Sequence, residues 1–159
     1  MREISKDGID FIKKWEEFVP HVYDDKIPKH RGPDGKLAYP EWKGGPVKGT
    51  LTIGYGHTDA AGAPKIVLGL ICTEAEATTM LHDDLHGVQA EVRRAIRVET
   101  TQHEYDAICS LTYNCGSALP KVAPLINADN FAAVPTKMLQ FVNSKGERMP
   151  GLVNRRNGE

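Results

Sequence analysis

The sequence lacks any long hydrophobic run. No apolar stretch approaches the roughly 18 residues that a membrane-spanning helix needs. The first dozen residues, MREISKDGIDFI, mix charged and apolar positions and have no apolar centre of the kind that a secretion signal carries. We therefore expect a chain without a secretion signal and without stable membrane insertion.

An excess of charge of either sign is also missing. Twenty lysines and arginines nearly balance 21 aspartates and glutamates, which leaves a net charge of -1 at pH 7. No half of the chain is strongly basic, as a duplex-DNA surface would require, so a nucleic-acid partner is not expected. Cysteine is scarce, since the chain has only Cys72, Cys109 and Cys115. This odd number without a disulfide-scaffold spacing indicates free thiols and synthesis in a reducing cytoplasm.

What the chain does have is the composition of a globular protein. Its 159 residues are 40% hydrophobic and 26% charged, enough for one ordinary domain or two small lobes. Apolar spacing predicts a first helix from about residue 4 to Glu16 or Glu17, and further helices over 73–98 and 101–116. It also predicts a helical stretch over 130–142 that Pro135 kinks or splits. Between them, residues 20–49 predict a long loop or short hairpin strands, and residues 51–58 predict a strand. The fold class expected from this order is α+β.

Helix starts are marked by capping residues. Ser5 is available as an N-cap for the first helix, and two capping boxes pair Thr73 with Glu76 and Thr101 with Glu104. These boxes predict where the second and third helices begin.

Two carboxyl groups could form the acid and base pair of a polysaccharide hydrolase. Glu16 lies at a predicted helix end beside Trp15 and Phe18, in a setting that favours the protonated acid. Asp25 follows in a polar segment, where an ionised carboxylate is easily solvated. Spacing alone does not single out this pair, because 21 acidic residues offer many others and a solvated helix end is the alternative interpretation.

Four ordered motifs resemble the bacteriophage-type lysozyme (endolysin) family, which includes the T-even and lambdoid phage lysozymes. They are WEEFVPHVYDD followed by TIGYGHT, then the ML..DL pattern at residues 80–85, then TQHEYDAICSLTYNCG, and finally PGLVNRR at residues 150–156. Together they extend over essentially the whole chain in the family's order.

The resemblance implies a two-lobed lysozyme-like fold in one domain, 1–159, in which residues 1–70 form an N-terminal helix and β lobe and residues 71–159 form a helical lobe. It implies a muramidase that cleaves the bond between N-acetylmuramic acid and N-acetylglucosamine in peptidoglycan with inversion. Glu16 would be the general acid, Asp25 would orient or activate the attacking water, and Thr52 would hydrogen-bond that water. Inversion requires the two carboxyl groups to lie about 6.5–9.5 Å apart.

Further site residues are expected around this centre. Tyr113, Thr58 and Trp42 would bind substrate, His57 would make structural hydrogen bonds at a strand end, and Arg155 would form an ion pair with Glu16. The resemblance implies no metal and no organic cofactor. It implies glycan strands of peptidoglycan as the partner, action on the wall after synthesis in the host cytoplasm, a monomer, and a separate holin-type pore for export.

The chain departs from the family pattern near the site. Glu17 stands where the family has a small residue, and 27 positions separate Asp25 from Thr52 where many relatives have about six. Residues 26–50 are thus an insertion, which leaves Asp24 as an alternative second carboxylate. Tyr39 or Trp42 within it could line one end of the glycan cleft, and the alternative is a tolerated surface excursion.

Three other functions were weighed from the residues. His82 and His86 have the i, i+4 spacing of a zinc helix, but no third ligand is evident and a solvated face is favoured. Cys109 or Cys115 with His57 or His103 could form a thiol hydrolase, but packing of the cysteines is favoured. A muramidase-like module that binds peptidoglycan without cleaving it is the remaining alternative.

Overall fold

The computed structural model describes residues 2–144 and 146–159, which form two compact units. The helical unit consists of the residues up to Trp15 together with Leu85–Glu159, and the β unit is Glu16–Asp84. The chain passes between them within the first helix and within the longest helix. The contiguous lobes expected at 1–70 and 71–159 stay a prediction.

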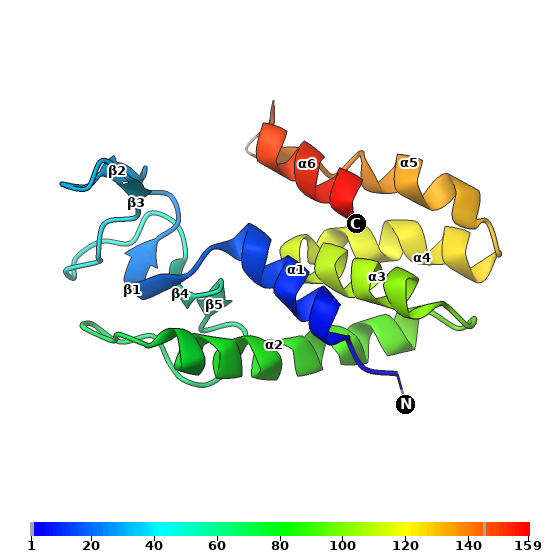
Figure 1. Cartoon of the computed structure of the whole chain (residues 1–159), viewed down its shortest axis with the longest axis horizontal. Coiled ribbons are helices and arrows are strands. Elements are labelled where there is room, and N and C mark those ends of the chain that lie inside the picture. The colour runs from blue at the N-terminus through cyan, green and yellow to red at the C-terminus, as the bar shows by residue number, and fades with distance from the viewer. Residues whose placement is uncertain (1, 145) are drawn as a thin grey trace. The chain divides into compact units, whose positions relative to one another are not determined.

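The β unit is built around a small antiparallel sheet (Figure 1). Its strands are β1 (Val19–Asp24), β4 (Leu51–Gly54) and β5 (His57–Thr58), in the order β1-β4-β5. The insertion adds a separate hairpin of β2 (His30–Arg31) and β3 (Leu37–Ala38). The segment 20–49 thus holds short strands, one of the two arrangements that its composition predicts.

The single strand predicted over 51–58 is wrong, because the chain reverses within it. Gly54 and Gly56 have φ angles of 65° and 93°, and β4 pairs back on β5 through Tyr55 and Gly56. Gly54 also lies close to the helix that follows, where an added Cβ would be 3.0 Å from the Cβ of Ala77. Glycine is needed there for both conformation and space.

The helical unit holds most of the remaining helices, with bounds α1 (Lys6–Glu16), α2 (Glu74–Ala95), α3 (Gln102–Asn114), η1 (Gly116–Ala118), α4 (Leu119–Asn127), η2 (Phe131–Ala133), α5 (Val134–Met138) and α6 (Pro150–Gly158), plus the strand pair β6 (Asn143–Ser144) and β7 (Glu147–Arg148). Glu16 is the last residue of α1 and the first of the β unit, and α2 enters the helical unit at Leu85. The core of this unit is one apolar cluster drawn from α2 to α5, including Val92, Ile108, Val122 and Met138. Burial of these side chains holds the short helices in place.

All three predicted caps are confirmed. Ser5 Oγ accepts a hydrogen bond from the Gly8 amide at 3.2 Å. In both the Thr73–Glu76 and Thr101–Glu104 boxes, the threonine hydroxyl accepts a hydrogen bond from the glutamate amide. The glutamate carboxylate in turn accepts one from the threonine amide. Each cap satisfies amides that have no partner within the helix.

The helical stretch predicted over 130–142 is wrong in its limits. It is a 3₁₀ turn followed by α5, which ends at Met138, and Pro135 lies in the first turn of α5. Proline is tolerated in this position, because the first turn of a helix needs no amide donor. The sequence also did not indicate α4, which contains Pro120 in its first turn and Pro124 inside.

Among residues 2–144 and 146–159, no helix combines the length and the apolar character that crossing a bilayer requires.

Candidate active site

Glu16 is presented at the C-terminal end of α1, where the helix stops abruptly. Glu17 adopts a left-handed conformation with φ of 60°, which ends the helix directly after Glu16. Glu16 is half-buried, whereas Glu17 is exposed and forms an ion pair with Lys29 of the insertion. The two adjacent glutamates therefore differ in their exposure to solvent.

Asp24 and Asp25 at the end of β1 also differ in their surroundings. Asp24 is buried, and its carboxylate accepts hydrogen bonds from the amides of Lys26, Lys48 and Gly49 at 3.0, 2.6 and 2.9 Å. These amides, the Lys48 amide foremost, hold the pKa of Asp24 below its usual range. Both oxygens of Asp24 are thus engaged in fixing the ends of the insertion.

Asp25 is exposed and keeps most of its carboxylate accessible. The Thr50 amide donates a hydrogen bond to its Oδ1 at 2.8 Å. Its own amide donates to the Thr50 carbonyl at 3.1 Å, which extends the pairing of β1 with β4 by one step. An exposed carboxyl group on a fixed backbone is suited to act on a water molecule.

Thr52 lies on β4 directly opposite Tyr23 of β1. It is buried, and its hydroxyl donates to the Thr50 carbonyl at 3.2 Å. With the hydroxyl hydrogen used in this way, the Thr52 oxygen is available to accept from another donor.

Tyr23 is buried on β1, opposite Thr52 of β4. Burial raises the pKa of its phenol, and the neighbouring groups Tyr39, Glu16, Asp25 and Glu17 act in the same direction. Glu16 ends α1, and Asp25 follows directly after β1. The sequence analysis did not assign a role to Tyr23, whose signal was its position within the VYDD motif.

Tyr39 of the insertion packs directly on Tyr23. The two rings are stacked with centroids 4.2 Å apart and planes 19° apart, and the Lys29 ammonium lies 4.9 Å from the Tyr39 ring centroid. His21 Nε2 is 2.9 Å from the Tyr39 carbonyl. The insertion is thus anchored over the candidate site.

Trp42 also lies along β1. Its amide donates to the Val22 carbonyl at 2.7 Å, and the indole is half-buried. Within the described part of the chain, its Nε1 is buried without a hydrogen-bond partner. A role of Trp42 in substrate binding stays a prediction.

Replacement of Tyr39 by alanine is expected to weaken substrate binding. Loss of one aromatic face should raise KM for soluble glycan strands about two- to tenfold, the range that an aromatic contact of about 0.5–1.5 kcal/mol supports. The change in kcat should stay within about twofold, because a contact remote from the reacting bond contributes to binding rather than to bond cleavage. The matched control is Leu37→Ala, which truncates an exposed apolar side chain of the same insertion. An unchanged KM in Tyr39→Ala would contradict a role of Tyr39 in substrate binding and would favour a surface loop without such a role.

His57 is buried in the β unit and is engaged at both ring nitrogens. Nδ1 lies 2.9 Å from Asp84 Oδ1, and Nε2 lies 2.9 Å from the Pro64 carbonyl. Burial raises the pKa of Asp84, and the contact with His57 opposes that rise. The carbonyl of Pro64 can only accept, so Nε2 carries a proton, and a second proton lies between Nδ1 and Asp84. These contacts are those of a structural residue, and Asp84 is a partner that the sequence analysis missed.

The other predicted residues fall in different places. Thr58 is half-buried and pairs with Thr52 across β4 and β5. Tyr113 is half-buried on α3 of the helical unit. Arg155 is buried there too, where it contacts Ser110 and forms an ion pair with Glu159. Contact of Arg155 with Glu16 would join the two units and stays a prediction.

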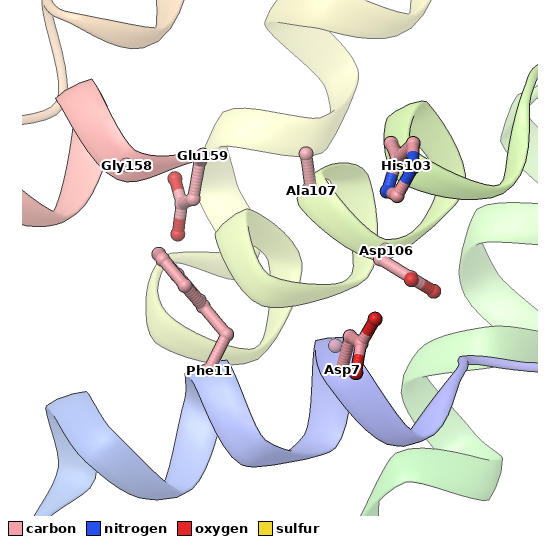
Figure 2. Close-up of a pocket in the computed structure, with 8 residues that line it drawn as sticks. Asp7, Phe11, His103, Asp106, Ala107, Gly158 and Glu159 are labelled. Atoms are coloured by element: carbon pink, nitrogen blue, oxygen red, sulfur yellow. The ribbon is translucent and has the colours of Figure 1, made fainter.

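The hollow of the helical unit shown in Figure 2 contains none of these candidates. It has a volume of about 200 Å³ and lies among α1, α3 and the end of α6. Two of its acidic side chains make structural contacts: Asp106 accepts hydrogen bonds from the Ser5 amide and from Gln102, and Glu159 accepts one from the Ser110 hydroxyl. This hollow is not part of the candidate site.

The metal and thiol alternatives receive no support from geometry. His82 and His86 are exposed on α2, and within residues 2–144 and 146–159 no group of three or more metal-binding side chains comes together. Cys109 is fully buried in the apolar core, and burial raises its pKa to about 12, which suppresses the thiolate.

Comparisons with known proteins identify the family of the chain. A model of the phage lysozyme family matches residues 36–159. An endolysin of Acyrthosiphon pisum secondary endosymbiont phage 1 is 32% identical over 118 residues, 70% of this chain and 77% of the relative. An endolysin of Bacillus phage PZA is 29% identical over 97% of this chain, which spans about half of that protein, 52% of its length.

A solved structure gives the same result. The endolysin from Escherichia coli O157:H7 phage FAHEc1 superposes with a TM-score of 0.73 at 29% identity, over 98% of this chain and 89% of that one. The expected α+β lysozyme-like fold and the resemblance are both confirmed. The chain belongs to the phage lysozyme family and is a glycoside hydrolase of peptidoglycan.

Proposed function

We propose that the chain cleaves the bond between N-acetylmuramic acid and N-acetylglucosamine with inversion, with Glu16 as the general acid. The observation that supports this assignment best is that one compact unit holds both carboxyl groups in contrasting settings, Glu16 half-buried at the end of α1 and Asp25 exposed directly after β1. Two carboxyl groups on either side of a sugar linkage are what glycoside hydrolysis requires. No metal or organic cofactor takes part in this mechanism.

The steps follow from what each side chain can donate or accept. Glu16 gives its proton to the glycosidic oxygen as the bond breaks, so the leaving sugar departs as a neutral alcohol. A water molecule attacks the anomeric carbon from the opposite face and gives up a proton to Asp25. The Thr52 oxygen, whose hydrogen is directed to the Thr50 carbonyl, accepts the other hydrogen of that water. Inversion by this route needs a separation of about 6.5–9.5 Å between the carboxyl groups.

Replacement of Asp25 by asparagine is expected to lower kcat about 10²-fold, at the lower end of the effect of a positioned base. The amide keeps the shape of the side chain but cannot take up the proton of the attacking water. The measurement is the rate of release of soluble fragments from purified peptidoglycan. Asp34→Asn, in an exposed turn of the insertion, is the matched control and should retain the wild-type rate. A wild-type rate in Asp25→Asn would remove Asp25 from the mechanism.

The site of action is the bacterial cell wall, because endolysins hydrolyse peptidoglycan. We propose that the chain is made in the host cytoplasm, acts as a monomer on glycan strands and reaches the wall through a separate holin-type pore. Its three free cysteines fit a reducing compartment. Expression in a bacterial host should cause lysis only when a pore-forming protein is expressed with it. Lysis on expression alone would contradict the need for a pore.

A further inference from the structure

The end of the insertion returns to β1 as three consecutive backbone amides. Those of Lys48 and Gly49 donate to Asp24, and that of Thr50 donates to Asp25. Backbone amides belong to a fixed chain and do not rotate freely as side chains do, so each bond fixes the orientation of the carboxylate that accepts it. We call residues 48–50 the amide cradle, because their three backbone amides hold the carboxylates of Asp24 and Asp25.

Gly49 fills the tightest position of this cradle. A Cβ added there would overlap Asp25 Oδ1 outright, and it would lie 2.8 Å from Asp24 Oδ1 and from Lys26 Cγ. Real Cβ atoms do not approach other heavy atoms this closely, so one or both carboxylates would have to move.

Conformation does not explain this glycine. The φ angle of Gly49 is not positive, so alanine can adopt the same backbone conformation. What excludes a side chain is the space taken by the two carboxylates. An alanine at this position therefore tests the placement of Asp25 rather than the folding of the loop.

We propose that Gly49, with the amides of residues 48–50, is a positioning element that sets the carboxylate of Asp25 for its step in hydrolysis. The inference rests on the proposed role of Asp25. It makes the C-terminal end of the insertion part of the catalytic apparatus, although nothing in it touches the substrate. Asp24 serves the same purpose, since its carboxylate joins the start of the insertion at Lys26 to its end at Gly49.

The test is a double-mutant cycle of wild type, Gly49→Ala, Asp25→Asn and the double variant, assayed for kcat and KM on soluble glycan strands. Gly49→Ala should lower kcat on the order of 10²-fold, the cost of a displacement of about 1 Å in a reacting group. KM should stay within about threefold, and the thermal unfolding midpoint should stay close to that of wild type. The double variant should be no slower than Asp25→Asn, because Gly49 acts through Asp25.

The matched control is Gly87→Ala, where the added Cβ meets nothing within 4 Å. Wild-type kcat in Gly49→Ala, or additive losses in the double variant, would overturn the inference while an impaired Asp25→Asn keeps the proposed function. Wild-type kcat in Asp25→Asn would instead reject the proposed role of Asp25, and the inference with it.

If Gly49→Ala does not fold, Asp24→Asn replaces it in the same cycle. The asparagine adds no volume, but its amide nitrogen faces the Lys48 amide where an acceptor is needed. The inference is supported if Asp24→Asn lowers kcat about tenfold relative to wild type, while adding Asp24→Asn to Asp25→Asn causes no further loss. A wild-type kcat, or a loss that persists in that background, overturns it.

Discussion

The Glu16→Gln variant is expected to lose lytic activity by a factor on the order of 10²–10⁴, the contribution that a general acid typically makes. Glutamine has nearly the same shape as glutamate, but it cannot give a proton to the glycosidic oxygen. Glu16 is the last residue of α1 and is half-buried, so the substitution should leave the helix and its packing intact. The decline in turbidity of purified cell walls gives the rate, and circular dichroism reports the fold.

Glu17→Gln is the matched control for this experiment. It makes the same chemical change one residue later, where the side chain is exposed and paired with Lys29. An exposed ion pair contributes little to stability, so this variant should stay within about twofold of the wild-type rate. Retention of more than roughly a tenth of the wild-type rate in Glu16→Gln would mean that another group supplies the proton.

The Asp84→Ala variant is expected to lower the free energy of unfolding by about 3–5 kcal/mol, the usual cost of removing one member of a buried charged pair. His57 would be left with its Nδ1 buried and without the carboxylate, while Nε2 still needs its proton for the Pro64 carbonyl. Urea denaturation followed by tryptophan fluorescence measures this change.

Asp83→Ala is the control for Asp84→Ala, because it truncates the preceding aspartate on the exposed side of the same helix. Its free energy of unfolding should change by no more than about 0.5 kcal/mol. A change below about 1 kcal/mol in Asp84→Ala would show that the pair with His57 does not stabilise the β unit.

Local signals in the sequence predicted the helix starts correctly. The Thr73–Glu76 and Thr101–Glu104 boxes depend on atoms only three residues apart, so no knowledge of the rest of the chain is needed to recognise them. The end of the first helix near Glu16 was predicted in the same way. By contrast, α4 carries two prolines and has little local helical signal. It is helical because Leu119, Val122, Ala123 and Ile126 are buried in the core.

The details of the site depend on contacts that are distant in sequence. Asp24 and Asp25 are identical neighbours, and what distinguishes them is the return of residues 48–50 more than 20 positions later. Similarly, His57 meets Asp84 across 27 positions. The sequence could indicate which residue types form the site, but it could not assign each carboxylate its partners.

The configuration of the first product formed is the most direct test of the proposed mechanism. Proton NMR, recorded while soluble glycan strands are hydrolysed, follows the anomeric signal of each new reducing end. We expect the reducing sugar to be N-acetylmuramic acid and to appear first as the α anomer, with the β anomer growing in later by mutarotation. Early appearance of the β anomer would contradict the mechanism, because retention requires a covalent intermediate and carboxyl groups only about 5–5.5 Å apart.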